Sequence, residues 1–575
     1  MSLNRPVIHK TSLRDSVEIV LPDGTVLSGP RNTPVGDFLR LLPNWDDPQV
    51  VGAIVNNELR ELTFKISMDS KVKPIDMTSA DGARIYRRSI TFLLEAAFEE
   101  LFPHAAMTID HSVSSGGYYC TVTGFEKLTQ EILDQLNQKM QEWVAADLPF
   151  EKKVVPLTEA IKVFSEKGYE DKVQLLKVRQ KDKLVLYRLG EHQDYLHGYM
   201  VPSTGYLHMF GLKLLGEGFV LIYPRRHMPG DLLPMPDYPK LLRTFVQYGN
   251  WLARLGIENV GALNNAIRNG RIRELILVSE ALHEQKISDI ARLVAGKSQT
   301  ARIVLIAGPS SSGKTTFSKR LSVQLLAQGC SPFPLEMDNY FVDREKTPRD
   351  ENGEFDYEAL NALDIARLES DLLALVSGAE VQLPRYDFRS GTSAPGEIVR
   401  LEKDQLILLE GIHGLNPGLL PNVPEETTFR LYVSCLTQLN LDRHNRISTT
   451  DTRLLRRIVR DQRERGYTAQ DTISRWESVR RGEKRHIFPF QENADEVFNS
   501  ALVYELSALR EMAEPLLRQV PFGTGEYIEA KRLLTFLEWF LPVDAELIPD
   551  NSILREFLGK SILKEFKLWD HKNGK

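Results

Sequence analysis

The eight residues GPSSSGKT, Gly308 to Thr315, constrain this chain more than any other stretch. They fit the pattern G-x-x-x-x-G-K-[ST]. They follow an apolar run at 303–307 that predicts a buried strand, and they precede a helical pattern from Phe317 to Leu326. Strand, glycine-rich loop and helix in this order are the context that a phosphate-binding P-loop requires. The alternative, a chance match in a serine-rich turn, is disfavoured by the two flanking elements.

In a P-loop, backbone N–H groups and the positive end of the following helix hold phosphate oxygens. The Lys314 ammonium would reach the β- and γ-phosphates of ATP, and the Thr315 hydroxyl would bind Mg²⁺. The residues expected to bind ATP are Gly308, Pro309, Ser310, Ser311, Ser312, Gly313, Lys314, Thr315 and Thr316.

Composition sets the broad class of the protein. The chain has 575 residues, of which 26% are charged and 42% hydrophobic, which predicts a globular protein of three or four domains. Its formal net charge of −6 gives no overall basic field for nucleic acid. Cys120, Cys330 and Cys435 are far apart, which suits a reducing cytosol and neither a disulfide framework nor a Cys-rich zinc site. Because no apolar stretch predicts a signal peptide or a membrane span, we expect a cytoplasmic protein without membrane contact.

The pattern along the chain predicts a multidomain protein of α/β and α+β type. Residues 16–78 alternate β-like runs with turns, as in a β-grasp module. From residue 301, strands alternate with helices, as in an α/β domain with a parallel sheet. A helix predicted near 129–145 places one apolar stripe on its surface, formed by Ile132, Leu136, Met140 and Trp143. The expected parts are 1–78, 79–225, a helical linker at 226–300, the α/β domain at 301–515 and a helical tail at 516–575.

Two carboxylates follow strands of the expected parallel sheet. Asp338 comes after a short strand in PLEMDNYFVD, and Glu410 ends the apolar run in LILLEGIHGLNP. Open α/β sheets place reactive groups at such strand ends. A phosphoryl-transfer enzyme needs one carboxylate to accept the proton of the attacking hydroxyl and another to hold Mg²⁺. Asp338 also fits a solvated turn, whereas a purely structural buried Glu410 is disfavoured.

Arginines repeat along the segment DTRLLRRIVRDQRERGY, residues 451–467. On a helix they fall on neighbouring turns of one face. Such a face is either solvated and paired with Asp461 and Glu464, or a lid whose arginines clamp the transferred phosphate. Together with the P-loop and the two acids, the pattern favours the lid.

These motifs together resemble the uridine kinase branch of the uridine kinase/phosphoribulokinase family. The matching stretches lie between about 300 and 515 and read GPSSSGKTTFSKRL, MDNYF, FDYEALNALD, LPRYDF, LLEGIHGLNP, RRIVRDQRERG and FPFQENADEVFNSAL. The resemblance implies that Asp338 is the catalytic base and that Glu410 lies near Mg²⁺. It implies a nucleoside pocket lined by Tyr340 and Tyr386. It also implies catalytic cations at Lys314, Arg457, Arg460 and Arg465.

The acceptor side departs from the family pattern. Family members carry a histidine shortly after YDF, where this chain has Arg389, Ser390 and Thr392, and a glutamine where it has Arg475. An additional arginine near the pocket favours an acceptor with its own phosphate or carboxylate. The sequence EGIH, which ends at His413, is closer to the corresponding segment of phosphoribulokinases. The expected acceptor-binding residues are Tyr340, Tyr386, Asp387, Arg389, His413 and Arg475.

The N-terminal half carries a second resemblance. Residues 16–78 resemble a TGS domain. Residues 79–225 resemble the editing-type second domain of threonyl-tRNA synthetases in RRSITFLLEAAFEELFP, GGYYCTV, EWVAADLPFEKKVV and HGYMVPSTGYLHMFGL. The resemblance implies the ligand pairs H-x-x-x-H and C-x-x-x-H, but the aligned residues are Arg88, Phe92, Leu196 and Met200. These side chains cannot rebuild a His/Cys centre, so we expect no zinc and no editing chemistry here. The histidines nearby, His192, His197 and His208, are interpreted as ordinary, partly exposed ones, with a small-molecule or RNA pocket as the alternative.

The sequence thus predicts a cytoplasmic kinase that uses ATP with Mg²⁺. The expected reaction transfers a phosphoryl group to the 5′-hydroxyl of a nucleoside such as uridine or cytidine. One alternative is a kinase for a sugar phosphate or another small metabolite. Another is a nucleotide-sensing regulator that contacts RNA or the ribosome through its TGS and synthetase-like parts. A homo-oligomer held by the helices at 226–300 is compatible with the pattern.

Overall fold

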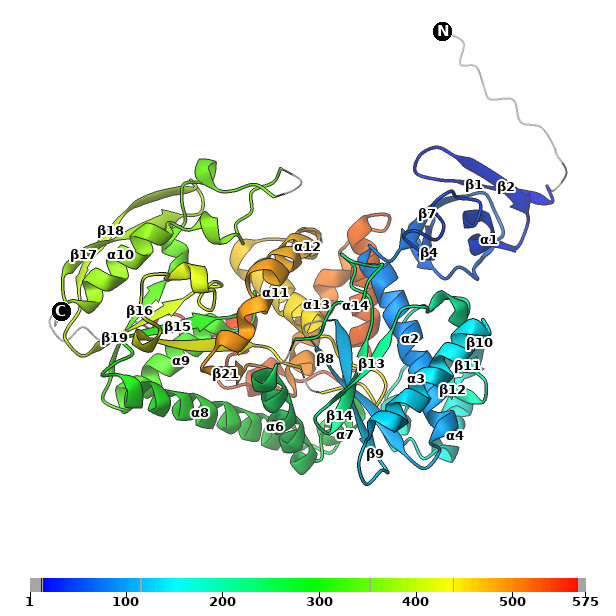
Figure 1. Ribbon diagram of the computed structural model, residues 1–575, viewed down its shortest axis with the longest axis horizontal. Coiled ribbons are helices and arrows are strands. Elements are labelled where there is room, and N and C mark those ends of the chain that lie inside the picture. Colours follow the sequence, from blue (N-terminus) through cyan, green and yellow to red (C-terminus); the bar gives the residue numbers. More distant parts are fainter. Residues whose placement is uncertain are drawn as a thin grey trace, which may run out of the picture. The chain divides into compact units, whose positions relative to one another are not determined.

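The computed structural model describes residue 12 and residues 14–113, 116–236, 238–350, 353–437 and 439–566. The chain divides into two compact units, whose elements Figure 1 labels. Unit 1 consists of Met1–Ala160, Lys181–Met235 and Phe522–Ile528. Unit 2 consists of Ile161–Gln180, Pro236–Pro521 and Glu529–Lys575. The boundaries of the five parts expected from the sequence stay a prediction.

Unit 1 begins with a five-stranded sheet in the order β2-β1-β7-β4-β5. Its strands are β1 (Ser16–Val20), β2 (Val26–Pro30), β4 (Val50–Val55), β5 (Glu58–Arg60) and β7 (Ser70–Asp76). β1 and β7 run parallel in the middle, and an antiparallel hairpin flanks each of them, as expected for a β-grasp module. The turn between β4 and β5 uses Asn56 and Asn57 with φ of 48° and 68°, which asparagine tolerates. The short elements α1 (Val35–Leu39), β3 (Thr33–Pro34) and β6 (Lys65–Ile66) complete it.

The rest of unit 1 combines helices with two antiparallel sheets, in the orders β13-β14-β9-β8 and β10-β11-β12. The elements are α2 (Ala80–Leu101), β8 (Ala106–Val113), β9 (Gly117–Thr123), α3 (Gln130–Ala145), β10 (Glu151–Pro156), β11 (Lys183–Leu189), β12 (His192–Asp194), β13 (Gly211–Leu215) and β14 (Gly218–Ile222). Leu136 and Met140 of α3 are buried, and Ile132 and Trp143 pack against the same core. The predicted apolar stripe is therefore confirmed.

Unit 2 is built on a five-stranded parallel sheet in the order β16-β19-β15-β20-β21. Its strands are β15 (Ile303–Ala307), β16 (Ser331–Glu336), β19 (Gln405–Glu410), β20 (Thr428–Ser434) and β21 (Glu496–Asn499). β15 lies at the centre, and all its residues are buried, as in a strand covered on both faces. Figure 1 shows α8 (Ile272–Lys297) and α9 (Lys314–Ala327) running along one side of this sheet. The predicted parallel-sheet α/β domain is confirmed.

Unit 2 contains further helices. They are α6 (Pro239–Leu255), α7 (Val260–Arg268), α10 (Ile365–Val376), α11 (Thr449–Arg465), α12 (Ala469–His486), α13 (Glu505–Arg518), α15 (Arg555–Leu558) and the part of α14 (Gly525–Leu537) from Glu529 onward. The strands β17 (Glu380–Asp387) and β18 (Thr392–Arg400) form a separate antiparallel hairpin. Within the described ranges, no helix combines the length and the apolarity that crossing a bilayer needs.

A segment from the synthetase-like part of the sequence belongs to unit 2. It contains the end of α4 (Leu157–Glu166) and all of α5 (Glu170–Leu176). Lys172 Nζ lies 2.8 Å from Asp442 Oδ1, and both side chains are fully buried. Asp171 accepts hydrogen bonds from Arg443 Nε and Nη2 at 3.0 and 2.8 Å. The sequence pattern assigns Lys172 to the part that ends at residue 225. It does not anticipate that Lys172 packs in unit 2, because its partner Asp442 is 270 positions away in the sequence.

Candidate active site

Three neighbouring strands deliver predicted site residues to one edge of the parallel sheet. β16, β19 and β15 are adjacent, and their carboxyl ends lead to Asp338, Glu410 and the P-loop. In the strand register, Glu410 lies opposite both Glu336 and Ile306. Because parallel strands end at the same edge, residues that are far apart in sequence meet here.

The loop between β15 and α9 has the backbone conformation that the motif predicts. Gly313 has a φ of 88° and Ser311 a φ of 57°, both in the left-handed region. A Cβ at Gly308 would lie 2.0 Å from the Val433 carbonyl oxygen, so no side chain fits there. Lys314 folds back over the loop, with its Nζ 3.3 Å from the Pro309 carbonyl oxygen. The strand, the loop and the helix expected from the motif are all present.

Thr315 and Glu410 form an oxygen-rich pair beside the loop. The Thr315 hydroxyl donates a hydrogen bond of 2.8 Å to Glu410 Oε1. Burial raises the pKa of Glu410 to about 7, against the opposing effects of the Lys314 charge and of the hydrogen bond from Thr315. Hydroxyl and carboxylate oxygens suit Mg²⁺, so this donor set fits the cation directly or through water. Thr315 and Glu410 would hold Mg²⁺, which would offset part of the negative charge of the phosphates.

Asp338 lies in the turn Met337–Tyr340, directly after β16. Its side chain keeps solvent-accessible surface, although it is set deep among protein atoms. This surrounding raises the pKa of Asp338, while the charges of Lys314 and Arg465 act to lower it. A carboxylate with a raised pKa is a better proton acceptor, which suits a general base.

The three predicted lid arginines converge on one buried carboxylate. Asp461 accepts hydrogen bonds from Arg457 Nε at 3.2 Å and from Arg460 Nη2 at 3.0 Å, and Arg465 Nη1 lies 3.5 Å away. Arg457 also donates to the Ser310 hydroxyl at 2.8 Å, which joins α11 to the P-loop. The pairing with Asp461, which the sequence allowed for a solvated face, therefore occurs at a buried group beside the loop.

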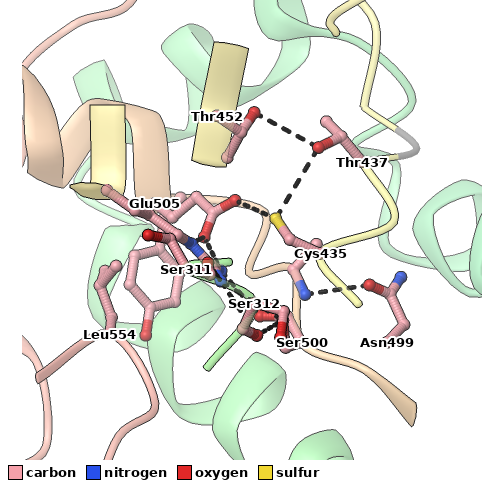
Figure 2. A network of polar contacts seen from close by, with 12 residues as sticks. Ser311, Ser312, Cys435, Thr437, Thr452, Asn499, Ser500, Glu505 and Leu554 are labelled. Carbon is pink, nitrogen blue, oxygen red and sulfur yellow. Dashed lines mark hydrogen bonds and ion pairs between the residues drawn. The ribbon is translucent and has the colours of Figure 1, made fainter. Parts of the chain in front are cut away.

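Arg456 of α11 contacts the backbone of the P-loop. It forms a buried ion pair with Glu505 of α13. Its Nη1 is 3.4 Å from the carbonyl oxygens of both Ser311 and Ser312, and it also contacts the Ser500 hydroxyl. Figure 2 shows Glu505 and Ser500 gathered beside Ser311 and Ser312. This arginine holds the loop backbone in place, because it donates hydrogen bonds to the loop's carbonyl oxygens.

Two glutamates reach the site without having been singled out in the sequence. Glu483 of α12 accepts a hydrogen bond of 3.1 Å from the Ser310 N–H and forms a buried ion pair with Arg453. Burial raises the pKa of Glu358 to about 7, and the negative charge of Glu483 adds to this, whereas Arg457 and Lys314 oppose it. Glu358 lies in the FDYEALNALD stretch, but a single acid in a loop has no spacing that reveals its role.

The two predicted pocket tyrosines lie in apolar surroundings. Tyr340 is buried and donates a hydrogen bond of 3.1 Å to Asp371 Oδ2. Tyr386 packs against Phe341 and Phe388, with ring centroids 5.6 and 5.0 Å away. Phe341 directly follows the turn that carries Asp338 and Tyr340. An aromatic cluster therefore lies next to the proposed base.

The other predicted acceptor residues have different surroundings. Asp387 Oδ1 accepts the Arg389 backbone N–H at 2.9 Å, which shapes the exposed turn of the β17–β18 hairpin. His413 is buried, and burial lowers its pKa to about 4, so its imidazole is neutral near pH 7. Arg475 is exposed and stacks on Tyr467 at 4.4 Å. Asp387 and Arg389 thus share one hairpin turn, whereas His413 follows β19 and Arg475 belongs to α12.

A parallel sheet in this order, with a P-loop after its central strand and acids at the ends of β19 and β16, the next two strands on one side, defines a P-loop kinase-type domain. Residues 303–507 match the Phosphoribulokinase / Uridine kinase family. This part of the chain is a domain of that family, and it is fused to a threonyl-tRNA synthetase-like N-terminal region.

The curated proteins that the chain is similar to include threonine–tRNA ligases. The chain is 30% identical over 190 residues to a threonine–tRNA ligase of Clostridium kluyveri, covering 33% of this chain and 30% of the ligase. It is 32% identical over 202 residues to that of Azoarcus sp., covering 35% and 32%. The matches thus span about a third of these ligases.

Among solved structures, a phosphoribulokinase from Rhodobacter spheroides has 18% identity and a TM-score of 0.24, covering 34% of this chain and 70% of that one. A D-glycerate 3-kinase from Cryptococcus neoformans has 15% identity and a TM-score of 0.27, covering 37% and 90%.

At the four positions of the synthetase ligand pairs, unit 1 shows packing. Phe92, Leu196 and Met200 belong to its hydrophobic core. Arg88 Nη1 donates a hydrogen bond of 2.6 Å to the Tyr199 carbonyl oxygen. These side chains are therefore engaged in the fold, and the expectation that this part holds no zinc stays a prediction.

An acidic cluster with one histidine lies nearby in unit 1. Glu95, His192 and Asp194 are buried, and their potential ligand atoms lie within 4.8 Å of one another. The expectation of a partly exposed His192 is therefore wrong, because the side chain packs inside unit 1. Burial alone lowers the pKa of His192, but hydrogen bonds to Glu95 and Glu99 raise it above its ordinary value. His192 contacts Glu95 through Nε2 and Glu99 through Nδ1, so polar contacts within the fold account for this cluster.

Proposed function

We propose that unit 2 transfers a phosphoryl group from ATP to the 5′-hydroxyl of a nucleoside. One observation carries this proposal: the P-loop, Asp338 and Glu410 follow three adjacent strands at one edge of the sheet. A phosphate cradle, a proton acceptor and an acid that suits Mg²⁺ are the groups that phosphoryl transfer to an alcohol needs.

Each side chain has a defined task in this reaction. The loop's backbone N–H groups and Lys314 hold the phosphates, and Asp338 takes the proton from the attacking hydroxyl. Arg457 and Arg460 donate hydrogen bonds to Asp461 in this structure. During the reaction their guanidinium groups would turn toward the transferred phosphoryl group and offset its negative charge. Because phosphoryl transfer needs little covalent help from the protein, positioning and electrostatics supply most of the rate.

The aromatic cluster around Tyr386 favours a nucleoside as the acceptor. Tyr386, Phe341 and Phe388 offer flat apolar surface beside the turn that carries Asp338. Aromatic rings pack well against a planar base. The exposed guanidinium of Arg475 suits the alternative, an acceptor that carries its own phosphate.

The acceptor can be tested with the full-length protein, ATP and Mg²⁺. We would offer uridine, cytidine and adenosine in one set and pentose phosphates in another, and identify the products by mass spectrometry. 5′-Deoxyuridine, which cannot be phosphorylated at that position, is the matched control for uridine. A nucleoside 5′-monophosphate is the expected product. Phosphorylation of sugar phosphates only, with a higher KM in Arg475→Ala, would replace the nucleoside proposal by the alternative.

A further inference from the structure

The C-terminal segment of unit 2 lies against the P-loop. In α15, the Glu556 oxygen Oε2 accepts a hydrogen bond of 3.2 Å from the Thr316 backbone N–H and one of 3.0 Å from the Thr316 hydroxyl. The Thr316 residue is only 5% exposed, whereas the neighbouring Thr315 is exposed. The segment therefore covers Thr316 and leaves the preceding residue, Thr315, open to solvent.

The N–H group that Glu556 engages is one that a bound phosphate needs. Thr316 is the third residue of α9, and the first N–H groups of a helix have no partner inside the helix. In a P-loop, these groups and the positive end of the helix hold phosphate oxygens. A carboxylate makes the same kind of hydrogen bond and carries charge of the same sign. Glu556 and a nucleotide phosphate therefore compete for Thr316.

Further contacts hold the backbone of this segment in place. A Cβ at Gly313 would lie 2.5 Å from Ile553 Cγ2, so the segment packs directly on the loop. Arg463 of α11 donates a hydrogen bond of 2.9 Å to the Glu556 carbonyl oxygen. Ile553 and Phe557 are fully buried. Because the backbone is anchored in this way, we expect the Glu556 side chain, rather than the whole segment, to move when a phosphate arrives.

We propose that Glu556 is a built-in competitor of the nucleotide, whose carboxylate occupies the α9 end of the phosphate cradle until a phosphate displaces it. This regulation rests on the proposed function and concerns the same site. A nucleotide binds only to molecules in which the competitor has left the site. The apparent nucleotide affinity is therefore the intrinsic affinity multiplied by the fraction of molecules in which the site is free. Its negative charge also repels phosphate at this end of the loop. Lys314 and Thr315, which directly precede Thr316 and keep solvent-accessible surface, are the groups that an incoming nucleotide reaches first.

Direct binding measurements test this proposal without relying on turnover. We would titrate ADP into the full-length wild type, Glu556→Ala and Glu556→Gln by calorimetry. Glu546→Ala is the matched control, because Glu546 belongs to the same C-terminal segment but pairs with the exposed Lys560. Removing a charge-assisted competitor predicts ADP binding that is tighter by about tenfold or more in Glu556→Ala. Glu556→Gln, which keeps the shape without the charge, is expected to fall between it and the wild type, and Glu546→Ala to match the wild type.

The outcomes separate this proposal from the proposed function. If both Glu556 variants bind ADP no more tightly than the wild type, Glu556 only caps α9 and the proposal is wrong. Should Glu556→Ala fail to fold, the isosteric Glu556→Gln decides. If neither the wild type nor any variant binds ADP, both proposals fail. A wild type that binds ADP but phosphorylates none of the acceptors contradicts the proposed reaction alone, and the variants still decide the role of Glu556.

Discussion

Lys172 and Asp442 form a fully buried ion pair of 2.8 Å inside unit 2, although they are 270 positions apart in the sequence. Replacing Lys172 by Met would leave the Asp442 carboxylate buried without this cation. Breaking one partner of such a pair costs about 3–5 kcal/mol of unfolding free energy. Denaturant titrations of Lys172→Met measure the loss. Lys346→Met, which removes an exposed ion pair with Asp343, is the control and should cost less than about 1 kcal/mol. Equal effects in the two variants would contradict the structural role of Lys172.

Lys314→Ala is expected to abolish turnover, because the ammonium reaches the phosphates and the remaining groups cannot replace its charge. A loss of at least about 10²–10³-fold in kcat is the scale for removing one stabilising group of this kind. Steady-state kinetics on the accepted substrate measure it. Lys319→Ala, five residues further along α9 and hydrogen-bonded to the Leu563 carbonyl oxygen, is the control. Near-normal kcat in Lys314→Ala would exclude the assigned site.

Asp338→Asn should lower kcat by about 10²–10⁴-fold, since an amide cannot accept the proton of the attacking hydroxyl. ATP binding should change little, because the P-loop is intact. A kinetic series in kcat and in the KM for ATP separates the two effects. Asp404→Asn, in the exposed turn before β19, is the matched substitution and should behave like the wild type. Normal kcat in Asp338→Asn would show that another group is the base.

His283 should make the protein less stable in acid. Burial lowers its pKa to about 3, with a further lowering by the charge of Arg320, so the folded state keeps the imidazole neutral. The unfolded chain binds its proton near pH 6.5. The unfolding free energy therefore falls as the pH drops below 6.5, by about 1.4 kcal/mol per pH unit for this group. His283→Gln should flatten the dependence between pH 6.5 and 4, whereas the exposed His104→Gln should not.

Glu358 should have the opposite effect on stability. Its pKa is raised to about 7 by burial, with the Glu483 charge adding to it, so the folded state holds a proton that the unfolded state has already lost. The stabilisation by this group is complete below its unfolded pKa of about 4.5 and is lost as the pH rises through 7. Denaturant titrations from pH 5 to 8 should show a shallower decline in Glu358→Gln than in the wild type. Glu354→Gln, an exposed neighbour, is the control, and the same slope in both variants would contradict the assignment.

Much of the kinase-type fold could be predicted because its signals are local. The run at 303–307 is apolar enough to be buried on both faces. The loop after it carries Gly313 where the backbone is left-handed and Gly308 where no side chain fits. Asp338 and Glu410 could be placed at strand ends because each follows a recognisable strand pattern. The apolar stripe of α3 was also predictable, since it follows the helical period.

Other parts of the site could not be predicted, because they depend on contacts between distant segments. Nothing in the sequence around Glu556 shows that it reaches Thr316, 240 positions away. The arginine stripe of α11 was visible, but its geometry depends on how deeply Asp461 is buried. The assignment of Ile161–Gln180 to unit 2 likewise follows from buried ion pairs with residues far along the chain.

The sequence by itself determined the chemistry that the P-loop can perform, because glycine positions, Lys314 and Thr315 act through local backbone geometry that a short motif specifies. Only the tertiary structure decided which carboxylates beyond the predicted Glu410 share that loop. Glu410, Glu483 and Glu556 come from three different segments, and each meets it only once the chain has folded. The physical reason is the distance along the chain over which each acts. A motif specifies the backbone geometry of a few consecutive residues, whereas the charged groups that shift the pKa values of a site are brought to it from distant segments by packing.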